Sequence, residues 1–261
     1  MTRMLQSGAG MRVGQLAVAI GILALWELCA RRGWVDASLL PPPSQIARHV
    51  VALPTEAEFW NAVGSTLSAA LTGLLIAVLV GVPTGIAIGA SAPVYRTTRL
   101  LVDVCRSFPV VALMPVLVLL MGTTPKMLVV VATLATVWPI LLQSSYGARS
   151  VEPLVSDTAR AFQIPARYRF THVLLPTAAP YIATGIRIAA TFALLVTIGT
   201  ELLSATPGLG REIAQAQEGA NFPLVMAYVF YSGVLGLALS ALLSRAERRL
   251  LAWHPSARIA E

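Results

Sequence analysis

The segment SDTARAFQIPARYRFTHVLLPTAAP, residues 156–180, is the longest polar and arginine-bearing interruption in an otherwise apolar chain of 261 residues. On each side of it lies an apolar stretch long enough to cross a bilayer, which takes about 20 residues. The segment therefore predicts two membrane spans joined by a structured loop.

Within this loop, the residue order predicts two short helices with a break between them. The Ser–Asp pair at 156–157 can cap the first helix. Pro165 disfavours the α region at Ile164, so the first helix is expected to end near Gln163. A second helix is expected from Ala166, with Pro165 at its first position.

The composition is that of an integral membrane protein. Hydrophobic residues make up 56% and charged residues 12% of the chain, and the mean hydropathy is +0.74. Soluble domains are less apolar and carry about 25% charged residues. The net charge of +7 is interpreted as arginine at the ends of spans rather than as a nucleic-acid site. We expect one all-α membrane domain over 1–261, with spans at about 13–30, 62–90, 100–121, 127–146, 178–203 and 224–243 and the loop at about 150–176.

Three glycines recur every fourth residue in the second expected span. Gly81, Gly85 and Gly89 share one helix face and let another helix approach closely. Packing within the chain and contact with a second subunit both explain this pattern.

Three charged residues in the expected spans are candidates for a pathway or a gate. Asp103 and Arg106 are three residues apart and can pair on one helix face, either as a structural ion pair or as part of a gate. Arg187 lies inside a span, where a charge usually faces protein or water. We expect Arg187 either to pair with a helix end or with Asp103, or to line the pathway.

The loop resembles the coupling loop of binding-protein-dependent ABC importer permeases. That loop has the form Glu-Ala-Ala, three residues, Gly, nine residues, Ile, any residue, Leu-Pro. Here the matching positions are Asp157-Thr158-Ala159, Gln163, Val173 and Leu175-Pro176, with the same spacing. Gln163 stands where the family has Gly, which takes φ > 0 more easily than Gln. Ile164-Pro165 is expected to supply the break instead.

In that family the loop docks in a groove of a cytoplasmic ATPase, so the resemblance implies a set of coupling residues. Asp157 is expected to cap the first helix and to meet polar groups of the ATPase. Ala159 and Ala161 would allow close docking, and Phe162 would fill an apolar notch. Arg160 is expected either to pair with an acidic residue of the ATPase or to be merely solvated. The full implied set is Asp157, Thr158, Ala159, Arg160, Ala161, Phe162, Gln163, Val173, Leu175 and Pro176.

Two further segments resemble the sulfonate, taurine and nitrate branch of these permeases. Trp26-Glu27-Leu28 followed by Leu40-Pro41-Pro42-Pro43-Ser44 is similar to the start of that branch, and residues 46–53 then predict a short amphipathic segment at the membrane interface. Gly208-Leu209-Gly210 resembles the family's external Gly-Leu-Gly segment, which precedes a short helix. The resemblance makes Gly208, Leu209 and Gly210 candidates for docking a binding protein.

The distribution of positive residues predicts the topology. With six spans and both termini in the cytoplasm, most Arg residues fall in cytoplasmic segments, as the positive-inside rule requires. The coupling loop then lies where an ATPase can reach it. The implied fold is that of a type I ABC importer permease, with many passes through the bacterial inner membrane.

No catalytic, metal or cofactor site is expected on this chain. Lys126 is the only lysine, and no Gly-Lys-Ser/Thr sequence of a Walker A loop exists. The three histidines lie far apart, without Cys or carboxylate at ligand spacing. The chain is therefore not expected to be an enzyme by itself, and ATP and Mg²⁺ are expected on partner subunits.

The leading hypothesis is the transmembrane subunit of an ATP-driven importer for a small solute, such as an organic or inorganic anion. Its expected partners are two ATPase subunits, a second permease chain (identical or a paralogue), an external or periplasmic binding protein and membrane lipid, but no nucleic acid. The alternative is a gradient-driven transporter or channel, which leaves the helix–break–helix loop unexplained. A scaffold subunit that has lost transport is a third interpretation.

Overall fold

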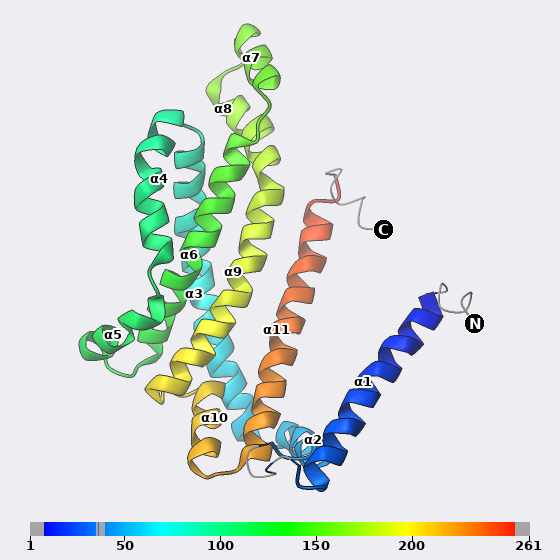
Figure 1. The fold of residues 1–261 in the computed structure, drawn as a ribbon. Helices are drawn as coiled ribbons and strands as arrows, with labels where there is room; N and C mark the ends of the chain where they lie inside the picture. Colours follow the sequence, from blue (N-terminus) through cyan, green and yellow to red (C-terminus); the bar gives the residue numbers. More distant parts are fainter. Residues whose placement is uncertain (1–7, 35, 37–39, 254–261) are drawn as a thin grey trace. The chain divides into compact units, whose positions relative to one another are not determined.

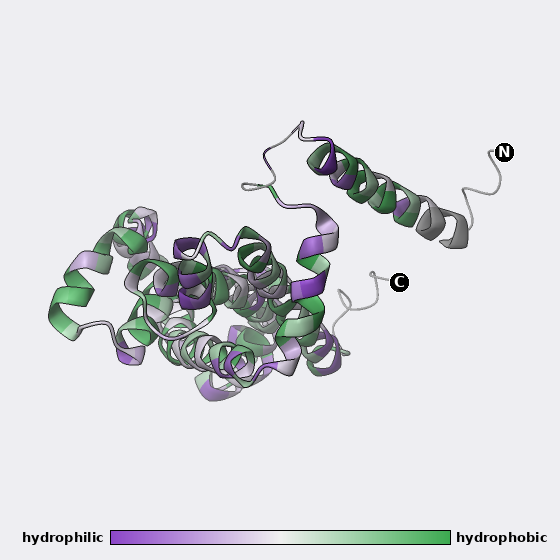
Figure 2. Cartoon of the chain, turned by 90° about the horizontal axis from the view of Figure 1, so that it is seen from below, coloured by the Kyte–Doolittle hydropathy of each residue, from purple (hydrophilic) through white to green (hydrophobic). Residues whose placement is uncertain are grey.

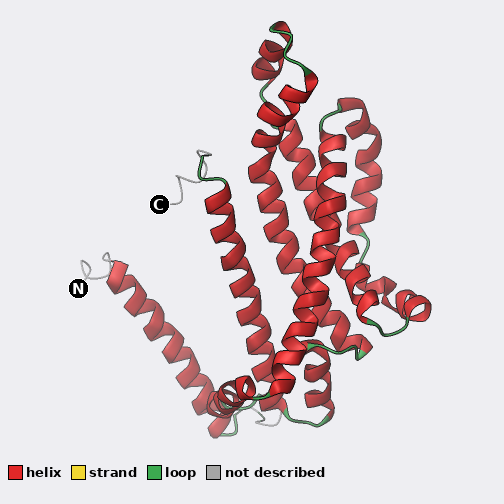
Figure 3. Ribbon diagram, turned by 180° about the vertical axis from the view of Figure 1, so that it is seen from behind, coloured by secondary structure: helices red, strands yellow, loops and turns green. Residues whose placement is uncertain are grey.

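The structure is a computed structural model that describes residues 8–34, 36 and 40–253. Throughout this part of the chain every regular element is helical, and Figure 3 shows helices joined by loops with no strand among them. The two chain ends, which the charge pattern assigns to the cytoplasm, lie outside the described residues.

The helices fall into long apolar elements and short connecting ones (Figure 1). Five helices are long and apolar enough to cross a membrane, and the described residues contain a sixth span if one bent pair counts as a single crossing. The all-α expectation is confirmed. The elements are α1 (Gly8–Arg31), α2 (Pro43–Ala52), η2 (Leu53–Thr55), α3 (Ala57–Gly89), α4 (Ala92–Ser107), η3 (Val110–Leu113), α5 (Met114–Met121), α6 (Pro125–Arg149), α7 (Pro153–Ala161), α8 (Ala166–Arg169), η4 (Phe170–Leu174), α9 (Leu175–Ser204), α10 (Leu209–Glu218) and α11 (Phe222–Leu250).

The described chain divides into two compact units. The first contains the residues up to Trp60 together with Glu212–Tyr231, and the second contains Asn61–Arg211 together with the residues from Ser232 onward.

In the first unit, Figure 2 shows α1 as mostly hydrophobic over its coloured part. Leu16, Val18 and Ile20 are all more than 60% exposed, as expected for a helix that faces lipid. Glu27, near the end of α1, accepts hydrogen bonds from the backbone N–H (3.0 Å) and the hydroxyl (2.8 Å) of Ser44. This contact holds the start of α2, because a carboxylate satisfies an otherwise unpaired N–H of the first helical turn.

The α2 helix is short and amphipathic, as the sequence predicts. The hydroxyl of Tyr231 donates a hydrogen bond of 2.6 Å to the carbonyl of Val50 and so ties α2 to α11 within the first unit. The ring of Tyr231 also lies 4.7 Å from that of Phe59, measured between centroids.

In the second unit, α3, α6 and α9 pack through small side chains. Its buried core contains five alanines from α3 and α9, one leucine of α3 and one isoleucine of α6: Ala70, Leu74, Ala77, Ile140, Ala189, Ala190 and Ala193. The small residues let the helix backbones approach closely, which is how helices associate where lipid removes the hydrophobic driving force.

The glycine face of α3 packs against α6 of the same chain. A Cβ on Gly81 would lie 3.0 Å from the side chain of Ile140, and a Cβ on Gly85 or Gly89 would meet a backbone carbonyl of α6. Of the two explanations that the sequence leaves open, packing against another helix of the same chain is therefore the one observed.

The third expected span is not one straight helix. It is divided between α4 and the η3–α5 segment, which meet at an angle of 72°. Phe108 is extended (φ −73°, ψ 126°) because the residue before a proline, here Pro109, disfavours the α region. Pro115 lies in the first turn of α5, where its missing N–H needs no partner. The span expected at about 100–121 therefore contains a break at Pro109.

Candidate coupling site and transport pathway

The coupling loop forms a helix, a tight turn and a second helix, all within the second unit. Figure 1 shows α7 and α8 beyond one end of α6 and α9. The first helix begins at Pro153, earlier than the sequence indicates, because proline is favoured in the first helical turn. Ser156 and Asp157 consequently lie inside α7, and the expectation that they cap it was wrong.

The turn after α7 is a Schellman motif. The N–H of Ile164 donates to the carbonyl of Ala159 (3.0 Å), and the N–H of Gln163 donates to that of Arg160 (2.9 Å). Gln163 has φ +52°, the left-handed conformation that this motif requires. The turn that the family forms with Gly is thus formed here with Gln, and the expectation that Ile164-Pro165 replaces it was wrong.

The second helix continues into the membrane span. Pro165 flanks α8 in an extended conformation (φ −56°, ψ 144°) and accepts hydrogen bonds from Tyr168 and Arg169, so it precedes the helix rather than occupying its first position. The π-helical turn η4 then joins α8 to α9 without a break. Pro176 explains this wide turn, because it has no N–H to donate to the carbonyl four residues earlier. Val173, Leu175 and Pro176 therefore lie where the coupling segment enters the span.

One face of α7 is exposed and partly apolar. Leu154, Thr158 and Phe162 follow one another at four-residue spacing, and Leu154 and Phe162 are 74% and 78% exposed. Asp157 and Arg160 are also exposed, and their charged atoms lie 3.8 Å apart.

The opposite face of α7 packs against the chain itself. Ala159 is only 5% exposed and lines a cavity of about 530 Å³ between the coupling segment and the ends of α3 and α6. Ala159 cannot contact an ATPase directly, which corrects that expectation, whereas Ala161 is exposed. Arg169 lines the same cavity, and its buried Nε makes no hydrogen bond within the described chain. The sequence did not single out Arg169.

Asp103 and Arg106 pair as the sequence predicts, with the Arg106 Nε 2.9 Å from a carboxylate oxygen. Asp103 also lies 3.8 Å from the Nε of Arg99, so two arginines share one carboxylate. All three residues are on α4.

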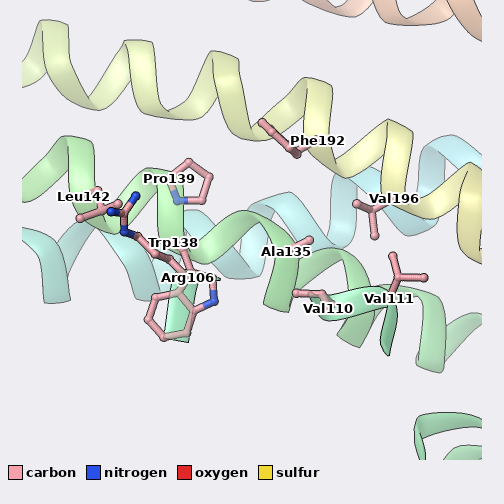
Figure 4. Close-up of a pocket in the computed structure, with 9 residues that line it drawn as sticks. All are labelled: Arg106, Val110, Val111, Ala135, Trp138, Pro139, Leu142, Phe192 and Val196. Carbon is pink, nitrogen blue, oxygen red and sulfur yellow. The ribbon is translucent and has the colours of Figure 1, made fainter. Parts of the chain in front are cut away.

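Arg106 reaches a cavity of about 340 Å³ beside the bend between α4 and η3 (Figure 4). The other lining side chains come from η3, α6 and α9, and they are Val110, Val111, Ala135, Trp138, Pro139, Leu142, Phe192 and Val196. Arg106 is the one charged residue in this lining. The cavity is thus apolar with a single cationic group, and small-molecule sites typically combine an apolar lining with few polar groups.

Arg187 pairs with a residue that the sequence did not indicate. Its guanidinium lies 3.3 Å from a carboxylate oxygen of Glu247 on α11. The expected alternative, pairing with Asp103, was wrong, since Asp103 is held by arginines of its own helix. Arg187 also does not line the cavity of Figure 4.

The connection between α9 and α10 is fixed from inside the second unit. The hydroxyl of Thr66 donates to Glu201 Oε2 (2.9 Å) and accepts from the N–H of Leu209 (2.9 Å). The same Oε2 accepts from the N–H of Gly210 (3.0 Å). Glu201 and Leu209 are fully buried.

The Gly-Leu-Gly residues face the chain interior. Gly208, Leu209 and Gly210 are all buried, so the expectation that they contact a binding protein directly is corrected. The short helix expected after them is present as α10, and its exposed side chains include Gln215, Gln217 and Glu218.

A metal centre finds no support in the described part of the chain. Within residues 8–34, 36 and 40–253, no three His, Cys, Asp or Glu side chains gather in an arrangement that could hold a metal ion.

These features define a multi-span helical membrane protein with a helix–turn–helix that projects from the ends of its spans. Residues 73–252 match the family described as "Binding-protein-dependent transport system inner membrane component". The chain belongs to this family, and it is the inner-membrane permease component of a binding-protein-dependent ABC importer.

Curated relatives align over most of their own length. The taurine transport system permease protein TauC of Escherichia coli (strain K12) is 28% identical over 247 residues, which cover 93% of this chain and 89% of TauC. The putative aliphatic sulfonates transport permease protein SsuC of the same strain is 27% identical, covering 96% and 95%. The nitrate import permease protein NrtB of Synechocystis sp. (strain PCC 6803) is 29% identical, covering 85% and 84%.

Solved structures share the fold. A chain of the MetNI methionine ABC transporter in an inward-facing conformation matches with a TM-score of 0.64 and 20% identity, over 76% of this chain and 97% of that one. A chain of a bacterial alginate ABC transporter, solved in complex with an alginate pentasaccharide-bound periplasmic protein, matches with a TM-score of 0.60 and 15% identity, over 95% and 96%. The type I importer permease fold implied by the sequence is confirmed.

Proposed function

We propose that this chain forms half of a pathway through which partner ATPases drive the import of a small oxyanion delivered by an external binding protein. Two ATPase subunits bind the coupling segments from the cytoplasm. A second permease chain, identical or a paralogue, completes the pathway. ATP and Mg²⁺ bind to the ATPases, and this chain converts their movement into opening of the pathway.

The observation that carries this proposal is the exposed stripe Leu154–Thr158–Phe162 on α7. Two large apolar side chains more than 70% exposed on a helix beyond the spans favour a protein partner over water. The family to which the chain belongs makes an ATPase the natural occupant. Asp157, Arg160 and Ala161 lie at the edge of the stripe and are exposed to the same partner.

The connection from α8 through η4 to α9 transmits the movement of the ATPases to the membrane span. Because these elements form one uninterrupted helix, a displacement of the coupling segment is passed to α9. The same helix contributes Phe192 and Val196 to the cavity of Figure 4. Movement at the ATPase therefore changes the lining of the proposed pathway directly.

The class of solute is inferred from the relatives and from this cavity. Taurine, aliphatic sulfonates and nitrate, which the names of the relatives specify, share a sulfonate or nitrate group with several acceptor oxygens. Arg106 supplies donors that suit such a group. The volume of about 340 Å³ lies within the range of small-molecule sites.

Co-purification tests the coupling part of the proposal. We expect the variant Leu154→Ala/Phe162→Ala to fold normally and to lose at least about tenfold in affinity for its ATPase, since exposed apolar anchors dominate such interfaces. Leu237→Ala is the matched control, because Leu237 is 73% exposed on α11 and lies far from α7 in sequence. Transport of nitrate or taurine by the purified chain in liposomes without any ATPase would instead support the gradient-driven carrier.

Transport kinetics test the role of Arg106. Arg106→Gln is expected to raise the KM for a transported oxyanion by about tenfold or more, because a hydrogen bond to a charged group is worth roughly 1.5–3 kcal/mol. Arg99→Gln is the control, since Arg99 also lies beside Asp103 but does not line the cavity. Equal KM values for the two variants would show that Arg106 does not bind the transported solute.

A further inference from the structure

The carboxylate of Glu201 is a buried acidic group that the transport pathway does not use. It lies in the last turn of α9, is 0% exposed and does not line the cavity of Figure 4. Its Oε2 accepts one hydrogen bond from Thr66 and one from the N–H of Gly210 in the first turn of α10. A negative group in this position is favoured by the partial positive charge of a helix N-terminus. Glu201 thus joins the end of α9 to the start of α10.

The joint leaves no space for movement between the two helices. A Cβ on Gly208 would collide with the Glu201 carboxylate, and a Cβ on Gly210 would collide with the carbonyl of Ile198 in α9. The two glycines are therefore present because α10 begins in direct contact with the end of α9. Ser65 adds a further tie, since its hydroxyl donates to the carbonyl of Pro207 (2.8 Å).

Thr66 extends the joint to α3. Its hydroxyl is fully buried and serves both as a donor to Glu201 and as an acceptor for the N–H of Leu209. A single hydroxyl uses its proton and a lone pair here, so replacing it with a methyl group breaks two hydrogen bonds at once. Thr66 and Glu201 form one unit with the first turn of α10.

We propose that Glu201 is a positioning residue that locks the segment 205–211, which contains the first turn of α10, to the end of α9, so that a contact of the external binding protein with this segment acts on the helix that carries the coupling segment. This inference rests on the proposed function. The helix that begins at Ala166 in the coupling segment ends at Ser204, three residues beyond Glu201. One helix therefore leads from the proposed ATPase contact at one end to the joint with the first turn of α10 at the other. Contact of a loaded binding protein with the segment 205–211 is transmitted along α9 to the ATPases.

Amide hydrogen exchange tests the lock itself, on the full chain in lipid nanodiscs. Thr66→Val and Glu201→Met are expected to speed exchange in residues 205–211 by about fivefold, the change that one lost net hydrogen bond produces. Glu201→Gln keeps an acceptor oxygen for both donors and is expected to restore slow exchange. Thr197→Val is the matched control, because Thr197 is also fully buried on α9, one turn before Glu201, and its hydroxyl makes no hydrogen bond within the described chain.

ATP hydrolysis by the assembled importer tests the transmission. The measured quantity is the ratio of hydrolysis with and without saturating loaded binding protein, with taurine and nitrate as the solutes tried. Thr66→Val and Glu201→Met are expected to lower this ratio by about fivefold, on the same hydrogen-bond basis. Glu201→Gln and Thr197→Val are expected to retain it. Rescue by Gln distinguishes positioning through an acceptor oxygen from a general loss of folded protein.

The outcomes separate the inference from the function on which it rests. Wild-type exchange and a wild-type ratio in both Thr66→Val and Glu201→Met overturn the inference and leave the importer intact. Faster exchange with an unchanged ratio also overturns it, because the lock then exists without transmitting anything. A chain that binds no ATPase overturns the proposed function and the inference with it.

Discussion

The guanidinium of Arg187 lies 3.3 Å from a carboxylate oxygen of Glu247, which joins α9 to α11 across 60 residues of sequence. The two side chains are 40% and 22% exposed. Arg187 is a charge in a largely apolar stretch of α9, whereas Glu247 lies in the charged last turns of α11 beside Arg248. A charge inside a span persists when it is paired or reaches water. The pair therefore holds α11 against the helix that carries the coupling segment.

A charge swap tests this pair. Arg187→Ala and Glu247→Ala are each expected to lower stability by about 1 kcal/mol, since partly exposed pairs contribute little more. Arg187→Glu/Glu247→Arg is expected to recover most of the stability that either reversal alone removes. Thermal unfolding in detergent is measured for the wild type, the two single charge reversals and the double reversal, which together form the cycle. Additive losses in the double variant would show that the two residues do not interact.

Gln163→Gly is expected to stabilise the coupling loop. Gln163 has φ +52°, and the left-handed conformation costs a residue with a Cβ roughly 1–2 kcal/mol. The greater freedom of Gly in the unfolded chain offsets part of this gain. Gln163→Val is the opposing variant, because a β-branched residue tolerates φ > 0 least. Unfolding temperatures should rank Gly above Gln above Val, and any other order argues against the Schellman turn.

Substitutions at two alanines of α7 distinguish an effect on the stability of the chain from an effect on ATPase binding. Ala159→Arg is expected to destabilise the chain by about 1–3 kcal/mol, since Ala159 is buried and lines the cavity that Arg169 also lines, so a second guanidinium would be buried beside the first. Ala161→Arg is expected to leave the unfolding temperature unchanged and to weaken ATPase binding, because Ala161 is exposed. Normal ATPase binding by Ala161→Arg would show that the ATPase contacts a part of α7 that does not include Ala161.

The glycine face of α3 supplies a test of helix packing. Gly85→Ala is expected to cost about 1–3 kcal/mol, because its Cβ would meet the Leu141 carbonyl and lie 2.7 Å from the Ser144 Cβ. Gly199→Ala on α9 meets nothing within 4 Å and is expected to be neutral or stabilising, as Ala is the better helix former. Equal effects of the two substitutions would contradict close contact between α3 and α6.

The local features of the fold could be predicted from neighbouring residues. Proline spacing predicted the break between α7 and α8, and small residues at intervals of four predicted a close helix contact. The start of α7 was misplaced because Ser156 and Asp157 are good capping residues, but Pro153 upstream already begins the helix. The bend at Pro109 could have been read from the sequence by the same rule that was applied to Pro165.

The long-range contacts of the site could not be predicted in this way. Thr66 and Glu201 are 135 residues apart, and nothing local marks either as the partner of the other. The burial of Leu209 likewise depends on where α10 begins relative to α9. A signal was nevertheless present: Glu201 is an acidic residue in an apolar stretch and needed a partner.

The π-helical turn η4 sets the direction in which the ATPase contact points. Such a turn holds one residue more than an α-helical turn, so loss of one residue from Phe170–Leu174 would restore regular winding. The coupling segment just before the turn would then rotate by about 100° around the axis of α9 and draw in by about 1.5 Å. A single insertion or deletion at this place would therefore turn the exposed face of α7 in another direction while the membrane-embedded helices keep their sequence.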